Sequence, residues 1–401
     1  MRQLIHRRVI VCPLSAAAAF AIVACAGGGA QAASGHRAAA PRTPVYRFGV
    51  VGNRGKIAKL ELHRPTLVRG IAGRVVQIAT SNSDGYALTS SGAVWAWGVG
   101  GYGELGNGKT PPYSTRAVQV RFPAGVRITR LANPMPFDDA LAIDSHGHAW
   151  GWGLDASGDL CQTALILARP ARLPLDHVTL ATGARTHSLL DSNGTVYACG
   201  NGEGGALGTG SFASSSTPVR VVALPAGQRV TALVSSWEGS GALLANGAYY
   251  DWGFNAAGQL GDRTTTNSAV PVRVALPAPV KQVFQGGSGP KNGQTIVLLR
   301  NASVWAWGNG IRGQLGDGTR QSSAHPVRVK LPRGFRTVTV NSGGYASYAI
   351  DGFGRLWDWG GNQNGQLGTG GRRRGTDIPQ DTGIHVEQIS STASNVAALG
   401  R

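Results

Sequence analysis

The segment Gly103–Thr110, with the sequence GELGNGKT, has the residue types and spacing of a phosphate-binding loop. In such a loop, backbone amides and a lysine hold the phosphates of a nucleotide at the start of a helix. Here Pro111 and Pro112 follow directly, and they are a poor beginning for a helix. The stretch also recurs at residues 313–319 without the lysine. This recurrence predicts turns of a repeat and no nucleotide site.

Residues that could perform catalysis are few. His187 has no partner visible in the sequence, and Asp138 and Asp139 form the only adjacent pair of acids. The sequence contains no G-x-S-x-G, H-E-x-x-H or EF-hand pattern. It also has no Cys/His cluster with the spacing of zinc ligands. We therefore expect no enzyme activity, catalytic residue, cofactor or metal.

Four arginines recur at one place, as the third residue of a Pro-x-Arg-apolar motif: Arg172, Arg220, Arg273 and Arg328. Strand alternation directs their side chains outward. They could form a basic rim that binds an acidic polymer or an acidic protein surface. They could instead guard an edge strand against pairing between molecules, and this second interpretation is preferred.

Trp237 and Phe137 lie outside the regular aromatic pattern of the chain. Each precedes a Gly of a recurring motif by sixteen residues, Gly253 and Gly153 respectively. We therefore expect both on one class of loop, at one face of the molecule. Exposed aromatic side chains at such a face are candidate anchors for a protein partner. Burial within their own loops is the alternative.

The composition restricts the elements that can position these residues. The 401 residues include 60 Gly and 20 Pro, with 42% hydrophobic and only 14% charged residues. The apolar fraction excludes a mostly disordered chain. The abundance of glycine favours short strands and tight turns over long helices. With 38 Lys and Arg against 20 Asp and Glu, the formal net charge is +18.

An internal repeat organises most of the chain. A Gly follows an aromatic residue or Cys at intervals of 47 to 55 residues, and a Gly-x-Leu-Gly motif begins five residues later. In one copy the pair is Cys199-Gly200, and in the preceding copy the second motif ends in Cys161. A weaker seventh copy begins at Val45–Gly49. The remaining pairs are Trp97-Gly98, Trp152-Gly153, Trp252-Gly253, Trp307-Gly308 and Trp359-Gly360.

Each repeat has the alternation of short strands. In Val94–Trp97 both tryptophans fall on one side, and Pro-initiated segments such as Pro271–Val274 are typical of edge strands. Seven units of about four strands each predict an all-β, seven-bladed β-propeller. The last copy ends at Leu399, where a strand like Val45–Gly49 is due. We therefore expect the two chain ends to share the final blade.

The Trp-Ala-Trp-Gly-x4-Gly-x-Leu-Gly unit resembles the regulator of chromosome condensation repeat. This resemblance covers residues 45–401 and implies a seven-bladed propeller that acts as a protein-binding platform. The eukaryotic founder is a nuclear exchange factor for a small GTPase, and similar secreted bacterial propellers include β-lactamase inhibitors.

The sequence departs from this family at several places. Members often carry a histidine nine residues before the Val of the Trp strand, and only His187 matches here. No blade has a long insertion that could serve as a wedge into a GTPase. Nucleotide exchange on a GTPase is therefore not expected. The equivalent positions in the other five clear copies hold Gly85, Ala140, Ser240, Thr295 and Ser347.

Residues 1–32 have the features of a signal peptide. A basic start precedes an apolar stretch, and Ala30-Gln31-Ala32 has the pattern of a cleavage site. Ile22–Cys25 resembles a lipobox, which would make Cys25 the lipidated first residue. Residues 33–44 are predicted to form a flexible tether. No later segment is long and apolar enough for a membrane-spanning helix.

Export would leave Cys161 and Cys199 in an environment that permits a disulfide. They could form one, or they could be two isolated buried thiols.

The sequence thus predicts a bacterial, secreted or cell-surface, non-enzymatic and monomeric module that binds an unknown extracellular or envelope protein. The alternatives are an inhibitor of an extracellular enzyme, an electrostatic binder of envelope or nucleic-acid polyanions, and, less favoured, a hydrolase or lyase.

Overall fold

The computed structural model describes residues 44–400 except 52–59, 134, 136–137, 157, 184, 238, 288, 290, 370–374 and 393–394. The predicted signal peptide with Cys25, nearly all of the predicted tether, and Phe137 therefore lie outside the described residues. In the described part, the only helix is the short 3-10 helix η1 (Glu203–Gly205). No helix there has the length and hydropathy needed to cross a membrane.

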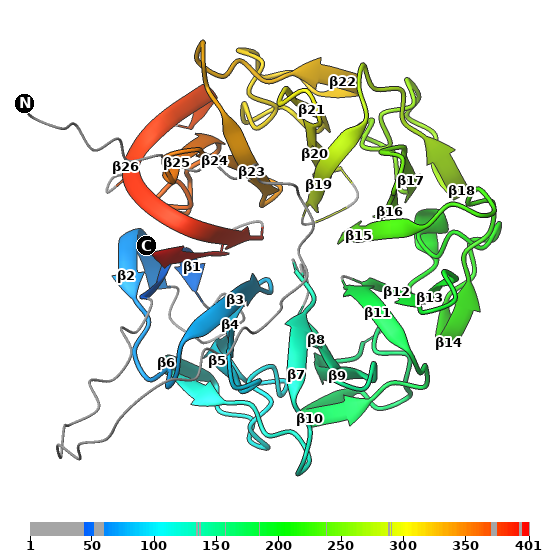
Figure 1. The fold of residues 1–401 in the computed structure, drawn as a ribbon, viewed down its shortest axis with the longest axis vertical. Coiled ribbons are helices and arrows are strands. Elements are labelled where there is room, and N and C mark those ends of the chain that lie inside the picture. Colours follow the sequence, from blue (N-terminus) through cyan, green and yellow to red (C-terminus); the bar gives the residue numbers. More distant parts are fainter. Residues whose placement is uncertain are drawn as a thin grey trace, which may run out of the picture. The chain divides into compact units, whose positions relative to one another are not determined.

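Antiparallel four-stranded blades surround a common centre, as Figure 1 shows. The first blade contains β3 (Val75–Thr80), β4 (Asp84–Thr89), β5 (Val94–Val99) and β6 (Tyr113–Gln119). The second contains β7 (Ile128–Leu131), β8 (Asp139–Asp144), β9 (Ala149–Leu154) and β10 (Ile166–Arg172). The third contains β11 (Val178–Thr182), β12 (Thr186–Asp191), β13 (Val196–Gly200) and β14 (Ser215–Arg220).

The fourth blade contains β15 (Val230–Ser236), β16 (Gly239–Leu244), β17 (Tyr249–Gly253) and β18 (Ser268–Arg273). The fifth contains β19 (Val280–Gly286), β20 (Gln294–Leu299), β21 (Val304–Gly308) and β22 (Ser323–Arg328). The sixth contains β23 (Thr337–Ser342), β24 (Ala346–Asp351), β25 (Arg355–Gly360) and the first part of β26 (Thr376–Ser391). The seventh contains the rest of β26, β27 (Asn395–Gly400), β1 (Val45–Val51) and β2 (Leu60–Leu67).

The two chain ends close the ring, as the sequence predicted. β1 pairs with β27 from Val45 opposite Leu399 to Gly49 opposite Asn395. The amide of Gly400 donates a hydrogen bond of 2.8 Å to the carbonyl of Pro44. The long strand β26 runs from the rim to the centre and joins the sixth and seventh blades into one sheet (Figure 1). The seventh blade therefore depends on segments from both ends of the chain.

Repeated tryptophans bind neighbouring blades together. The side chain of Trp152 is completely buried, and its indole N–H donates a 2.9 Å hydrogen bond to the carbonyl of Glu104 in the preceding blade. Gly106 packs on this ring with a φ of 57°, and a Cβ there would lie 3.0 Å from the indole. Only glycine fits this close approach. Equivalent indole bonds connect Trp252 to Ala206, Trp307 to Gln259 and Trp359 to Gln314.

Strand direction gives the disc two distinct faces. We call one the loop face: it carries the connections from first to second strands and from third to fourth strands of each blade. We call the opposite one the hairpin face: it carries the turns from second to third strands and the connections between blades. Because β1 begins where a turn from second to third strand is due, Pro44 and Gly400 both lie at the hairpin face.

Candidate functional site

Two aromatic side chains stand on the loop face, each beside an arginine. Trp237 is half-buried, and the Arg185 guanidinium from the neighbouring blade lies 5.7 Å from the centre of its ring. Tyr345 is also half-buried, and the guanidinium of Arg312 lies 4.4 Å from its ring. Both distances are within the range of cation–π attraction. Trp237 lies in the connection between β15 and β16, on the loop face.

Exposed apolar side chains also lie on the loop face, on the connections from third to fourth strands. They are Leu165, Phe212 and Ile311, with exposed fractions of 63%, 59% and 57%. Ile311 directly precedes Arg312 in the chain. Exposed apolar residues near aromatic and arginine side chains are typical of protein-binding surfaces.

The four recurring arginines end the outer strands β10, β14, β18 and β22, and all four are exposed. Each stands opposite an aromatic residue of the adjacent strand, for example Arg220 opposite Tyr197 and Arg328 opposite Trp305. Arg172 also makes an ion pair with Asp176. Similar open grooves of 730, 710 and 680 Å³ on the hairpin face include Arg220, Arg273 and Arg328 in their walls. The basic rim is therefore a feature of four consecutive outer strands, whereas Gln119 and Asp381 hold the equivalent places in the first and sixth blades.

The contact between the second and third blades differs from the others because it is covalent. Cys161 and Cys199 form a disulfide, with their Cα atoms 5.4 Å apart. Cys199 occupies the place of the buried tryptophan, and Cys161 occupies the place of the glycine that packs on it. The disulfide thus replaces the tryptophan–glycine contact found between other blades.

His187 compensates for the lost volume of the tryptophan. It stands directly opposite Cys199, whereas small residues stand opposite the tryptophans, such as Ser240 opposite Trp252. Its Nε2 lies 3.0 Å from Oδ2 of Asp139, and both side chains are completely buried. Burial alone would lower the pKa of His187, but the charge of Asp139 raises it above the usual value. The packing between the second and third blades therefore explains the His187–Asp139 pair.

Buried carboxyl groups make the stability of the protein dependent on pH. Burial raises the pKa of Asp251 to about 8, although Gln285, Tyr249 and the amide of Trp252 donate hydrogen bonds to it. The unfolded chain ionises this group near 3.8 while the folded protein keeps the proton. The folded state then binds more protons between these values, so the free energy of unfolding falls as pH rises from about 4 to about 8.

Replacing Asp251 by Asn is expected to weaken this pH dependence. The uncharged amide has no proton to retain, so the melting temperature should fall less between pH 5 and pH 8 than in the parent protein. Thermal unfolding followed by circular dichroism at several pH values measures this difference. Glu203→Gln, at an exposed position, is the matched control and should keep the parental slope. An Asp251→Asn variant with the parental slope would contradict the assignment.

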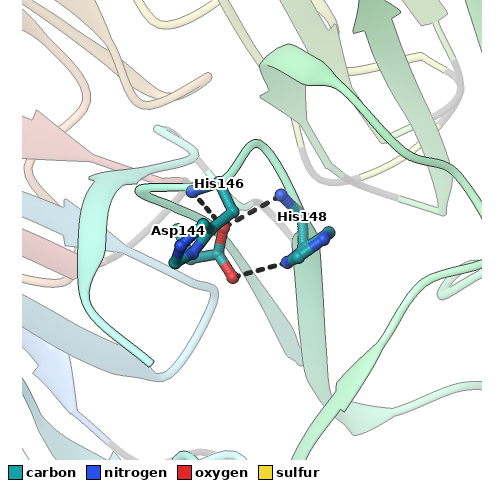
Figure 2. Close-up of side chains that lie close together, drawn as sticks. All are labelled: Asp144, His146 and His148. Atoms are coloured by element: carbon teal, nitrogen blue, oxygen red, sulfur yellow. Dashed lines mark hydrogen bonds and ion pairs between the residues drawn. The ribbon is translucent and has the colours of Figure 1, made fainter. Parts of the chain in front are cut away.

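A hairpin in the second blade brings Asp144, His146 and His148 together at its tip (Figure 2). Oδ1 of Asp144 accepts hydrogen bonds from the amides of His146 and His148, at 2.8 and 3.0 Å. Its Oδ2 lies 3.0 Å from Nδ1 of His148 and accepts a bond of the same length from the indole of Trp150. Burial opposes ionisation of Asp144, but the bonds from Trp150 and the two histidines lower its pKa below the usual value.

The equivalent hairpins of the third and sixth blades carry an aspartate at the position of Asp144, and this comparison shows what the Asp144 carboxylate does. Asp191 accepts the same two amide bonds from Asn193 and Thr195, although that hairpin has no histidine. Asp351 accepts them from Phe353 and Arg355, and the Arg355 side chain also pairs with it. The carboxylate therefore stabilises a tight turn in each of these hairpins.

The segment Gly103–Thr110 lies in the connection between β5 and β6, and strand β6 follows it. It belongs to the repeat, as predicted, because Gly106 packs on the tryptophan of the next blade. The pair of acids at Asp138 and Asp139 is also structural: both side chains are buried, and Asp139 contacts His187.

The fold and repeat contacts define a propeller of the RCC1-like class, and the chain matches the RCC1-like domain family over residues 44–400. The protein belongs to this family. It is 26% identical to the ultraviolet-B receptor UVR8 of Arabidopsis thaliana over 314 residues, which cover 76% of this chain and 70% of the receptor. It is also 26% identical to the human E3 ubiquitin-protein ligase HERC2, but the match spans only 6% of that ligase.

Solved structures confirm the architecture. Human WBSCR16 superposes with a TM-score of 0.77 at 18% sequence identity, covering 90% of this chain and 99% of that one. Prp20p of Saccharomyces cerevisiae superposes with a TM-score of 0.74 at 19% identity, covering 90% and 92% of the two chains. At these identities the likeness establishes the fold alone.

Proposed function

We propose that the protein is an exported, non-enzymatic module that binds a partner protein on its loop face. The carrying observation is the pair of aromatic–arginine contacts, Trp237 with Arg185 and Tyr345 with Arg312. Tryptophan, tyrosine and arginine contribute most of the binding energy at many protein interfaces. The rigid blades hold these side chains in place, so little conformational entropy is lost on binding.

Relatives provide independent support for a binding role. The structure of Prp20p was described together with its binding to Gsp1p and histones, and UVR8 is a receptor. The present chain would use the same type of scaffold for a different partner, an extracellular or envelope protein. An inhibitor that covers the active site of an extracellular enzyme is one form that this partnership can take.

The disulfide supports the proposal of export. Disulfides between buried cysteines form and persist in oxidising compartments and are rare in the reducing cytosol. The Cys161–Cys199 bond therefore agrees with the predicted signal peptide, and with a protein that is secreted or held at the cell surface by Cys25.

Replacing Trp237 by Ala is expected to weaken partner binding at least about 30-fold, because loss of a central aromatic anchor costs about 2 kcal/mol or more. The measurement is affinity capture from the cell envelope and medium with stepped salt elution, followed by titration of the captured protein. The melting temperature should change little, since Trp237 is only half-buried. Phe212→Ala tests whether the outer part of the loop face contributes.

The matched control lies on the opposite face. Arg273→Ala removes an exposed side chain from the basic rim and should leave binding to the loop face unchanged. A captured protein that binds the Trp237→Ala variant as tightly as the parent would refute the proposed anchor.

A second candidate function is the binding of an acidic polymer by the hairpin face. Among the described residues, the turns and connections of this face outside strand β26 carry nine exposed Lys and Arg side chains and one exposed carboxylate, Asp176. The arginine rim adds to this positive charge. In the capture experiment, polymers that elute at modest salt and are lost with the rim arginines would favour this function, because release of counterions makes such binding salt-dependent. The nine cations are Arg69, Arg74, Arg121, Arg127, Arg229, Arg300, Lys330, Arg333 and Arg336.

A further inference from the structure

Three histidines lie on two neighbouring segments of the hairpin face. His146 and His148 stand on the turn between β8 and β9, and His177 lies in the connection from the second blade to the third. Three of the nine histidines of the chain thus gather in two adjacent segments. The backbones are in direct contact: the amide of Val178 donates a 2.8 Å hydrogen bond to the carbonyl of Gly147. A Cβ built on Gly147 would lie 3.3 Å from Cα of His177.

The rings of His146 and His148 already lie side by side. Their centres are 5.9 Å apart and their planes differ by 23°. Ligand atoms of these two residues and of Asp144 all lie within 4.8 Å of one another. Two nitrogens bound to one zinc ion at about 2.0–2.1 Å are about 3.3 Å apart in tetrahedral geometry. His146 is exposed and His148 is 28% exposed, so both side chains have room to rotate toward that separation.

Asp144 prepares His148 to act as a ligand. Its carboxylate lies 3.0 Å from Nδ1, so this nitrogen carries the proton and donates it to Oδ2. The other ring nitrogen, Nε2, then keeps its lone pair for a metal ion. Carboxylates hold metal-binding histidines in this way in many proteins. Asp144 itself accepts three further hydrogen bonds, so we assign it to the positioning of His148 and not to direct ligation.

We propose that His146, His148 and His177 form a binding site for a divalent transition-metal ion of the zinc or copper type. Imidazole is the preferred ligand for these ions among the side chains present here. The site contains residues of two segments, so a bound ion would tie the second blade's hairpin to the connection that leads into the third blade. This property is independent of the partner proposed for the loop face.

Isothermal titration of the full chain with Zn²⁺ tests the site. We expect one ion to bind per chain at this site, and the double variant His146→Ala/His148→Ala to lose it. His177→Ala should weaken the affinity at least about 10-fold, and Asp144→Asn should also weaken it, by about 10–100-fold, through the orientation of His148. A saturating concentration of Zn²⁺ should raise the melting temperature of the parent protein and not that of the double variant.

The matched control is His325→Ala, which removes an exposed histidine of the rim and should bind Zn²⁺ like the parent. Melting without metal verifies that each variant is folded. A double variant that titrates like the parent would overturn the site. An unchanged affinity in His177→Ala would overturn the assignment of the third ligand, and an unchanged affinity in Asp144→Asn would overturn the positioning role.

Discussion

Deletion of Val45–Val51 is expected to abolish cooperative folding of the propeller. The strand β1 pairs with β27 on one side and with β2 on the other, so its loss leaves two unpaired edges and separates β2 from the ring. Phe48, which is completely buried in the place of the repeat tryptophan, is lost as well. Truncation of such a phenylalanine alone costs about 3–5 kcal/mol. Most domains are stable by only about 5–15 kcal/mol.

Circular dichroism and size-exclusion chromatography measure the effect of the deletion, and a circular permutant is the control. Joining Gly400 to Pro44 through a short linker should be tolerated, because these residues are already hydrogen-bonded. New ends can be placed between Asn301 and Ala302, in an exposed turn of the fifth blade. The permutant should melt close to the parent protein. A deletion variant that melts at the parental temperature would show that the ring does not need β1.

Replacement of Cys199 by Ser is expected to lower the free energy of unfolding by about 4 kcal/mol. The disulfide closes a loop of 38 residues, and the entropy of closing such a loop in the unfolded chain corresponds to about this value. The contact between the second and third blades also lacks the tryptophan that stabilises other contacts. Urea unfolding, with and without a reductant, measures the difference.

A triple variant can separate the covalent bond from the packing that it replaces. Cys161→Gly, Cys199→Trp and His187→Ser together restore the residue types of the neighbouring contact, where Gly208 packs on Trp252 and Ser240 stands opposite. This variant should recover much of the stability lost in Cys199→Ser and should not respond to reductant. Cys199→Trp alone should be worse, because the indole would meet His187. If the triple variant is no more stable than Cys199→Ser, then the disulfide does not stand in for the tryptophan–glycine contact of the other blades.

The sequence was sufficient to predict the blades and the closure of the ring. Both follow from a repeat whose register is visible in the spacing of Trp-Gly and Gly-x-Leu-Gly. The pairing of Cys161 with Cys199 stayed open because a cysteine alone does not reveal its neighbour. The signal was nevertheless present: one cysteine stands in the glycine position and the other in the tryptophan position, and those two positions touch between adjacent blades.

The candidate sites were less predictable from sequence. Trp237 was identified because it departs from the repeat, but Arg185, Tyr345 and Arg312 were not. They come from connections on different blades, and such connections carry no periodic pattern. The gathering of His146, His148 and His177 was missed for a related reason, since 28 residues lie between His148 and His177 and only the return of the chain brings them together.

The shared seventh blade has a consequence for biosynthesis. During translation β1 emerges among the first parts of the propeller, whereas its partner β27 is among the last. The earlier blades can pair internally as each is completed, but β1 and β2 must wait as an isolated hairpin with an open edge. Such edges can pair with other chains and lead to aggregation. A chain stalled shortly before residue 395 would therefore have most of its blades and still lack a closed ring.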